Sequence, residues 1–154
     1  MENEVDIAKL IHRGGVLRDV DGKTPQEIYK KVCSMIDLPD GMTADQVYNA
    51  LCAREEVLST AVGNGIALPH ARTPIMKEES EQRIIVVYLK NPIDMKAPDE
   101  RPVTVLFVLL THNSQVHLKV LSALAGLFRD SDFRKALEMQ VDEATLSSLI
   151  KRLA

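Results

Sequence analysis

Two features that many small proteins depend on are scarce in this sequence: it has no tryptophan and only two cysteines among its 154 residues. Cys33 and Cys52 are nineteen positions apart, with no CxxC motif and no third cysteine. Neither a zinc knuckle nor a disulfide framework can be built from such a pair. We expect both side chains to be buried thiols in a reducing compartment.

A strong charge of one sign and long apolar runs are also lacking. The net charge is −3 and no basic stripe stands out, which argues against a nucleic-acid partner. No apolar run approaches the roughly 18 residues of a membrane span, so direct membrane insertion is not expected. Residues 1–6 are acidic where a signal peptide would be basic. We therefore expect a cytoplasmic protein.

The length and the 45% hydrophobic content allow one substantial core, so we expect residues 1–154 to form a single domain. Residues 84–89 and 103–110 are nearly continuous aliphatic runs, which is typical of strands buried on both faces. The polar stretch 71–82 reads as an exposed loop. Periodicity predicts further strands over 16–20 and 66–68, and helices over 5–13, 25–36, 44–54, 115–129, 131–138 and 142–153. This order favours an α/β fold in which helices sandwich a mixed β-sheet.

Capping residues give several of these helices a defined start. Thr24 precedes Pro25 and stands three residues before Glu27, as in a capping box. Thr43 is an equally good cap for the next helix, which is expected to close at Arg54. If Ser114 is the cap of the helix over 115–129, His117 is the third residue of that helix and lies in its first turn.

The stretch that ends at His70 has the features of a strand that presents one histidine. Gly63 and Gly65 permit positive φ. Residues 66–68 can pair as a short strand, with the side chains of Ile66 and Leu68 on the same face. Pro69 removes a ladder donor, which suits the place where a strand leaves a sheet. His70 would then lie at a strand end, where α/β folds hold their chemistry. The same pattern also fits a turn, a buried strand and a histidine with a structural hydrogen bond.

A histidine at such a position can act as a nucleophile toward phosphorus. Neutral imidazole is nucleophilic, and its ordinary pKa of about 6.5 leaves much of it neutral at cell pH. A phosphorylated His70 would need groups that hold the added charge. The sequence offers Arg54 as a fork for phosphate oxygens, and His117 in the first turn of its helix as a donor of one N–H. Backbone N–H groups are available nearby in sequence at Gly63, Asn64 and Gly65.

Metal binding is the rival use of these histidines. It would need three convergent ligands, and the sequence shows neither an HxxxH motif nor a neighbouring carboxylate set. His12 and His112 have no spacing that recruits them, so we interpret them as structural. No metal site and no cofactor are predicted.

At these residues the chain resembles a known family. The run Gly63-Asn64-Gly65-Ile66-Ala67-Leu68-Pro69-His70, preceded by Arg54-Glu55, looks like the active-site segment of the enzyme IIA domains of the bacterial phosphotransferase system, fructose–mannitol type. Residues 92–103 and 117–125 continue the resemblance, which spans nearly the whole chain. The Gly-Asn-Gly-Ile-Ala form is most similar to the nitrogen-regulatory branch.

The resemblance implies a phosphocarrier. His70 would accept a phosphoryl group on Nε2 from a phosphohistidine carrier protein resembling HPr, and His117 and Arg54 would orient and stabilise it. In the regulatory branch, the phosphorylation state sets which target proteins are bound. In sugar-uptake members, the next acceptor is a cysteine of an enzyme IIB domain, which we expect here on another polypeptide.

Two departures from the family pattern keep a third reading open. Ala61 and Ala71 stand where family members usually have threonine and glycine, while Arg72 keeps a positive charge. Both alanines require backbone angles that an alanine can adopt. If they abolish phosphorylation, the chain would be an interaction-only module.

Overall fold

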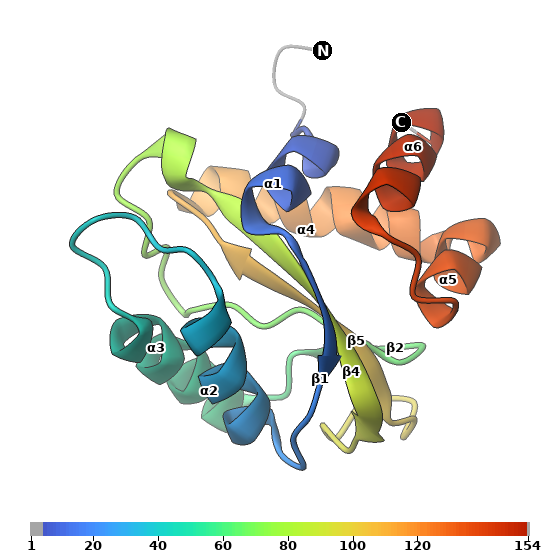
Figure 1. Cartoon of the computed structure of the whole chain (residues 1–154), viewed down its shortest axis with the longest axis horizontal. Helices are drawn as coiled ribbons and strands as arrows, with labels where there is room; N and C mark the ends of the chain where they lie inside the picture. The colour runs from blue at the N-terminus through green and yellow to red at the C-terminus, as the bar shows by residue number, and fades with distance from the viewer. Residues whose placement is uncertain (1–4, 154) are drawn as a thin grey trace.

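The computed structural model describes residues 5–153, and in that range the chain forms one five-stranded mixed sheet (Figure 1). Its strands are β1 (Val16–Val20), β2 (Ala61–Gly63), β3 (Ile66–Ala67), β4 (Arg83–Ile93) and β5 (Val103–Leu110). They lie in the order β1-β4-β5-β3-β2. The pairs β1–β4 and β3–β5 are parallel, and β4–β5 and β2–β3 are antiparallel. The predicted mixed sheet is confirmed, and β2 is an addition that the sequence patterns did not indicate.

Helices cover both faces of the sheet (Figure 1). One face carries α1 (Ile7–Gly14), α4 (Ser114–Arg129), α5 (Ser131–Glu138) and α6 (Glu143–Leu153). The other carries α2 (Pro25–Met35) and α3 (Ala44–Val57). This is the sandwich predicted from the order of the elements. None of the helices within residues 5–153 combines the length and the apolar character needed to cross a membrane.

The two long strands separate two hydrophobic cores. Along β4, Ile84 and Val86 face the core under α1 and α4, while Ile85 and Val87 face the core under α2 and α3. All four side chains are fully buried. The continuous aliphatic runs therefore arise because each face of the sheet needs its own apolar residues.

The first helix lies directly on β4. A Cβ atom added at Gly14 would come 2.0 Å from the carbonyl oxygen of Ile84, far inside van der Waals contact. Only glycine allows this approach. The helix begins at Ile7 because Asp6 caps it by accepting from the backbone N–H of Lys9 at 3.0 Å.

Two helix boundaries differ from the predictions and change how the site is built. The helix α3 continues one turn beyond Arg54 to Val57, so Arg54 lies within its last turn. The cap of α4 is Asn113, not Ser114, because the Asn113 side chain accepts from the backbone N–H of Val116 at 2.8 Å. His117 is therefore one position deeper in the helix than predicted. The caps predicted at Thr24 and Thr43 are confirmed.

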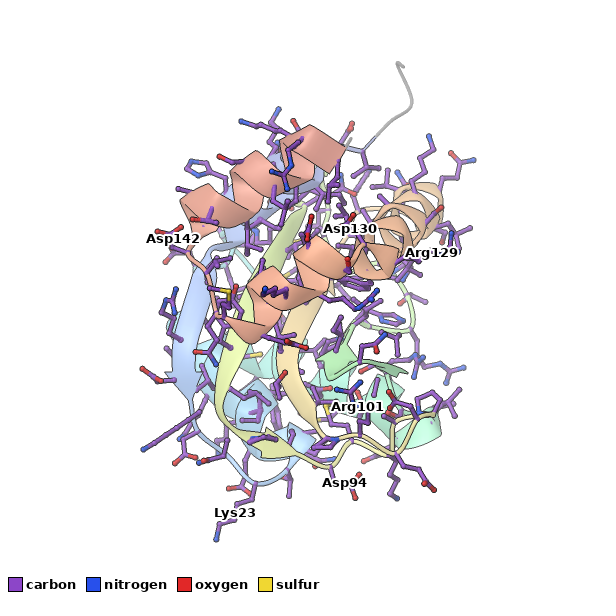
Figure 2. All side chains as sticks on the ribbon, turned by 90° about the vertical axis from the view of Figure 1, so that its right-hand side faces the viewer. Lys23, Asp94, Arg101, Arg129, Asp130 and Asp142 are labelled. Atoms are coloured by element: carbon purple, nitrogen blue, oxygen red, sulfur yellow. The ribbon has the colours of Figure 1, made fainter. Side chains whose placement is uncertain are left out.

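One residue serves both helices at the corner between α4 and α5. Figure 2 shows Asp130 where α4 ends and α5 begins, beside Arg129. The N–H of Asp130 donates to Leu127, and its carboxylate accepts from the N–H of Phe133 at 2.9 Å. A single aspartate thus ends one helix and starts the next.

The stretch 71–82 is less exposed than its polarity suggested. Met76 and Gln82 are each only 3% exposed. The N–H of Met76 donates to the carbonyl of Thr111 at 3.1 Å, and the Gln82 side chain accepts from the N–H of His112 at 2.9 Å. The prediction of an exposed loop holds for most of the segment, but these contacts attach Met76 and Gln82 to the residues that follow β5.

Candidate active site

His70 lies at the carboxyl end of β3, as predicted. After Ala67 the chain continues extended, so that the N–H of Leu109 donates to the carbonyl of Pro69 at 2.8 Å. His70 itself forms an isolated parallel bridge with Leu109 near the end of β5. Two parallel strands therefore end together at the histidine, at the kind of sheet edge where α/β proteins hold ligands.

The ring of His70 is held in one orientation by a backbone carbonyl two residues earlier in the chain. Its Nδ1 lies 2.7 Å from the carbonyl oxygen of Leu68. A carbonyl oxygen can only accept, so Nδ1 carries the hydrogen and the lone pair of the neutral ring is on Nε2. Burial lowers the pKa of His70 below its usual 6.5, and the charge of Arg54 adds to this, against opposing effects of the Leu68 carbonyl and Glu55. At neutral pH the ring is uncharged and nucleophilic.

His117 lies beside His70. The two ring centroids are 4.7 Å apart with the ring planes inclined by 50°. Burial, together with the neighbouring His70, lowers the pKa of His117 to about 4. Its Nδ1 is 3.2 Å from the hydroxyl oxygen of Thr111. The site thus holds two adjacent imidazoles that are both neutral at pH 7.

Arg54 completes the group from the other face of the sheet. It lies in the last turn of α3, where one guanidinium nitrogen donates to the carbonyl of Leu58. Its charge contributes to the lowered pKa of His70. The fold thus brings His70, at the end of β3, against His117 of α4, while Arg54 of α3 acts on His70 through its charge.

The glycine turn is not brought to the same place. Gly65 accepts at its carbonyl from the N–H groups of Thr104 and Val105, at the beginning of β5. The N–H of Asn64 donates to Asp99 at 2.8 Å. His70 is five residues further along an extended chain, roughly 16 Å away. The structure thus does not support the prediction that the amides of Gly63, Asn64 and Gly65 bind the phosphoryl group.

The two alanines that depart from the family pattern are unstrained. Ala61 and Ala71 both have negative φ, whereas positive φ is adopted nearby by Asn64 and its glycine neighbours. Ala61 is buried in the core under α2 and α3. The backbone around His70 therefore accommodates alanine at both positions.

The carboxylate of Glu55, which the sequence patterns did not single out, acts on His70 and bonds to two neighbouring residues. Glu55 accepts from the Tyr29 hydroxyl at 2.6 Å, from the Thr60 hydroxyl at 2.7 Å and from the Thr60 N–H at 2.8 Å. Burial and this carboxylate raise the pKa of Tyr29. Glu55 also acts on His70, whose pKa it raises against the effect of Arg54. Its only signal in the sequence was its position next to Arg54.

The remaining histidines are occupied elsewhere. His12 interacts through Nδ1 with Glu143 at 2.8 Å on an exposed surface, and His112 donates from Nδ1 to the carbonyl of Met76 at 3.2 Å. Within residues 5–153, no three histidine, cysteine, aspartate or glutamate side chains are grouped in a way that could hold a metal ion.

The hollow at the site is small. A cavity of about 10 Å³ is lined by His70, His117, Thr73, Leu109 and Thr111, among others. Pockets for small organic ligands occupy about 300–1,000 Å³. A larger groove lies between α1, α4 and α6, but it is lined by none of the predicted site residues. The cavity at His70 is too small to enclose a sugar.

Comparison with known families identifies this arrangement. Residues 9–153 match the family model described as "Phosphoenolpyruvate-dependent sugar phosphotransferase system, EIIA 2". The chain belongs to this family. It is therefore a component of a phosphotransferase system, and its fold is that of the IIA structures it matches.

Its relatives include regulatory members. The chain is 30% identical over 137 residues to the nitrogen regulatory protein of Pseudomonas aeruginosa, covering 86% of each. It superimposes with a TM-score of 0.79 on the nitrogen regulatory protein IIA-Ntr of Neisseria meningitidis, at 25% identity and over 94% of this chain and 98% of that one. The Escherichia coli enzyme IIA for mannitol, solved in complex with phosphorylated enzyme IIB, shares the fold at 14% identity, a TM-score of 0.57 and coverage of 91% and 85%.

Proposed function

We propose that His70 accepts a phosphoryl group on Nε2 from the phosphohistidine of an HPr-like carrier. The observation that carries this proposal is the hydrogen bond from Nδ1 to Leu68, which leaves Nε2 as the nitrogen with a lone pair. In the transfer, an Nε2–P bond forms as the N–P bond of the donor breaks. The donor imidazole keeps the electron pair of the broken bond, and no water is consumed.

His117 and Arg54 would stabilise the phosphoryl group without carrying it. A neutral His117 can donate an N–H to a phosphoryl oxygen while remaining uncharged. The guanidinium of Arg54 can donate two parallel hydrogen bonds to phosphate oxygens. The partner would complete the shallow site and exclude water during transfer.

We propose further that the chain acts mainly as a regulator. A phosphoryl group on His70 adds about −1.5 to −2 charges at the surface, which can switch the choice of partner protein. The similarity to nitrogen regulatory proteins supports this role. The second candidate is a sugar-uptake EIIA that passes the phosphoryl group to a cysteine of a separate enzyme IIB, as the family description and the mannitol complex suggest.

The test is the intact mass of the purified protein after incubation with phosphoenolpyruvate, enzyme I and an HPr-type carrier. We expect one acid-labile phosphoryl addition to the wild-type chain and none to His70→Ala. The His117→Ala variant should still be labelled, but should transfer more slowly, because it keeps the nucleophile and loses a stabilising donor.

Each outcome has a distinct meaning. If several carriers fail to label a folded wild-type protein, the chain is an interaction-only module. If the labelled protein rapidly phosphorylates an enzyme IIB cysteine, the sugar-uptake role is correct and the regulatory one is not. If His117→Ala transfers at the wild-type rate, the role given to His117 is wrong.

A further inference from the structure

Thr111 is a buried hydroxyl that the phosphocarrier proposal leaves without a role. It follows directly after β5 and is 4% exposed. Its carbonyl accepts from the N–H of Met76, so the residue is attached to the segment after His70 by its backbone. Its hydroxyl oxygen lies 3.2 Å from Nδ1 of His117. Because threonine is stiff at χ1, this hydroxyl is held in a fixed position.

The direction of this hydrogen bond follows from the hydroxyl's surroundings. Within the part of the chain that the structure describes, His117 Nδ1 is the only side-chain or backbone group that is hydrogen bonded to the Thr111 hydroxyl. If Nδ1 donated the hydrogen, the hydroxyl hydrogen would be left buried without an acceptor, which is unfavourable by about 1–3 kcal/mol. The hydroxyl therefore donates, Nδ1 accepts, and the hydrogen of the neutral His117 ring is on Nε2.

We propose that Thr111 is a positioning residue that holds His117 in the Nε2–H tautomer, so that this imidazole donates to a phosphoryl oxygen at His70. The two rings are then complementary. His70 has its hydrogen on Nδ1 and its lone pair on Nε2, while His117 has its lone pair on Nδ1 and its hydrogen on Nε2. The part of this inference that concerns phosphoryl transfer rests on the proposed phosphorylation of His70. The assignment of the His117 tautomer does not depend on it.

The tautomer can be measured on the unphosphorylated full chain. Long-range ¹H–¹⁵N correlation spectra distinguish protonated from unprotonated ring nitrogens. At pH 7 we expect Nδ1 of His117 to be unprotonated in the wild type and in Thr111→Ser. In Thr111→Val, which has a similar volume and no hydroxyl, we expect a mixture of the two tautomers.

A matched control separates this effect from a general loss of stability. Thr104 lies near the beginning of β5, at the opposite end of the strand from Thr111, and its hydroxyl donates to the carbonyl of Gly65 at 3.3 Å. Thr104→Val makes the same chemical change and should leave the His117 tautomer unaltered. Thermal unfolding of all variants shows whether each is folded at the temperature of the spectra.

The second readout is the rate of phosphoryl transfer from a phosphorylated HPr-type carrier. We expect Thr111→Val to be roughly tenfold slower, the effect of losing about one oriented hydrogen bond, and Thr111→Ser to recover most of the rate. The inference is overturned if wild-type His117 has a protonated Nδ1, if Thr111→Val keeps the wild-type tautomer, or if it transfers at the wild-type rate. Failure of the wild type to become labelled would instead overturn the phosphocarrier function and leave the tautomer assignment standing.

Discussion

His70 and His117 are kept neutral by different surroundings. Burial and the charge of Arg54 lower the pKa of His70, and its hydrogen bond to the backbone carbonyl of Leu68 works in the opposite direction. His117 is buried and close to His70, with no carboxylate contributing to its lowered pKa. Each ring thus accommodates a proton less readily than imidazole in water does. Because the His70 ring is neutral, a phosphoryl group can approach its Nε2 without displacing a proton.

The lowered pKa of His117 predicts that acid destabilises the fold. In the unfolded chain the pKa of this ring is 6.5, whereas in the folded protein it is about 4. Between these pH values the unfolded chain binds more protons, so the free energy of unfolding falls as the pH is lowered through this window. Urea unfolding from about pH 7.5 to about pH 4 should show a smaller fall for His117→Gln than for the wild type. Equal slopes would contradict the assignment.

The geometry of the Arg54 side chain is expected to matter beyond its charge. Arg54→Lys keeps a cation at the end of α3 but cannot donate two parallel hydrogen bonds to one phosphoryl group. We expect roughly tenfold slower phosphoryl transfer with an unchanged free energy of unfolding. Stopped-flow or quench measurements with a phosphorylated HPr-type carrier test this. A wild-type rate in Arg54→Lys would reduce the role of Arg54 to charge alone.

Among the elements, the start of α4 determines where His117 lies. Asn113 caps this helix, and the N–H of His117 donates to the Asn113 carbonyl at 3.0 Å. The cap therefore determines both where the helix begins and how its first turn presents the imidazole. The end of α3 acts in the same way for Arg54, whose guanidinium is tied to the chain that leaves the helix.

We therefore expect Asn113→Ala to affect both stability and transfer. Loss of a side-chain cap lowers the free energy of unfolding by about 1 kcal/mol. Asp142→Ala is a matched control, since Asp142 accepts from the N–H of Thr145 at 2.9 Å at the start of α6. Both variants should lose similar stability in urea unfolding, but only Asn113→Ala should slow phosphoryl transfer. Equal transfer rates would show that the cap does not position His117.

At the scale of the whole molecule, two exposed apolar side chains lie next to site residues. Leu58 and Leu118 are 69% and 66% exposed, and they adjoin Arg54 and His117. Exposing an apolar side chain to water is unfavourable, and such side chains are typical of surfaces that a partner protein covers. The site and its border thus form one surface suited to another protein.

Leu118→Glu tests this surface. The side chain is already exposed, so we expect the free energy of unfolding to change by less than about 0.5 kcal/mol. Transfer from a phosphorylated HPr-type carrier should weaken, with a raised KM, since an apolar contact is replaced by a charge. Met139→Glu, at a residue that is 68% exposed beyond the end of α5, should leave the KM unchanged. Equal KM values for both variants would place the donor elsewhere.

Much of the architecture and part of the site could be predicted from the sequence because the relevant interactions are local. The nearly continuous aliphatic runs at residues 84–89 and 103–110 indicated strands with two buried faces. The threonine caps indicated helix starts, since a cap bonds to an N–H only a few residues away. The family motif singled out His70, His117 and Arg54; the fold brings the two histidines side by side, and the charge of Arg54 acts on His70.

Other features were decided by the tertiary structure. The glycine turn is close to His70 in sequence, yet an extended chain rises about 3.3 Å per residue and carries the two apart. The carboxylate of Glu55 gains its role from Tyr29 and Thr60, which α2 and the start of β2 bring to it. The sequence by itself determined that a histidine would stand at the end of a buried strand. Only the tertiary structure decided that a second imidazole would lie beside it, because that contact depends on how α4 and the end of β3 meet at the end of β5.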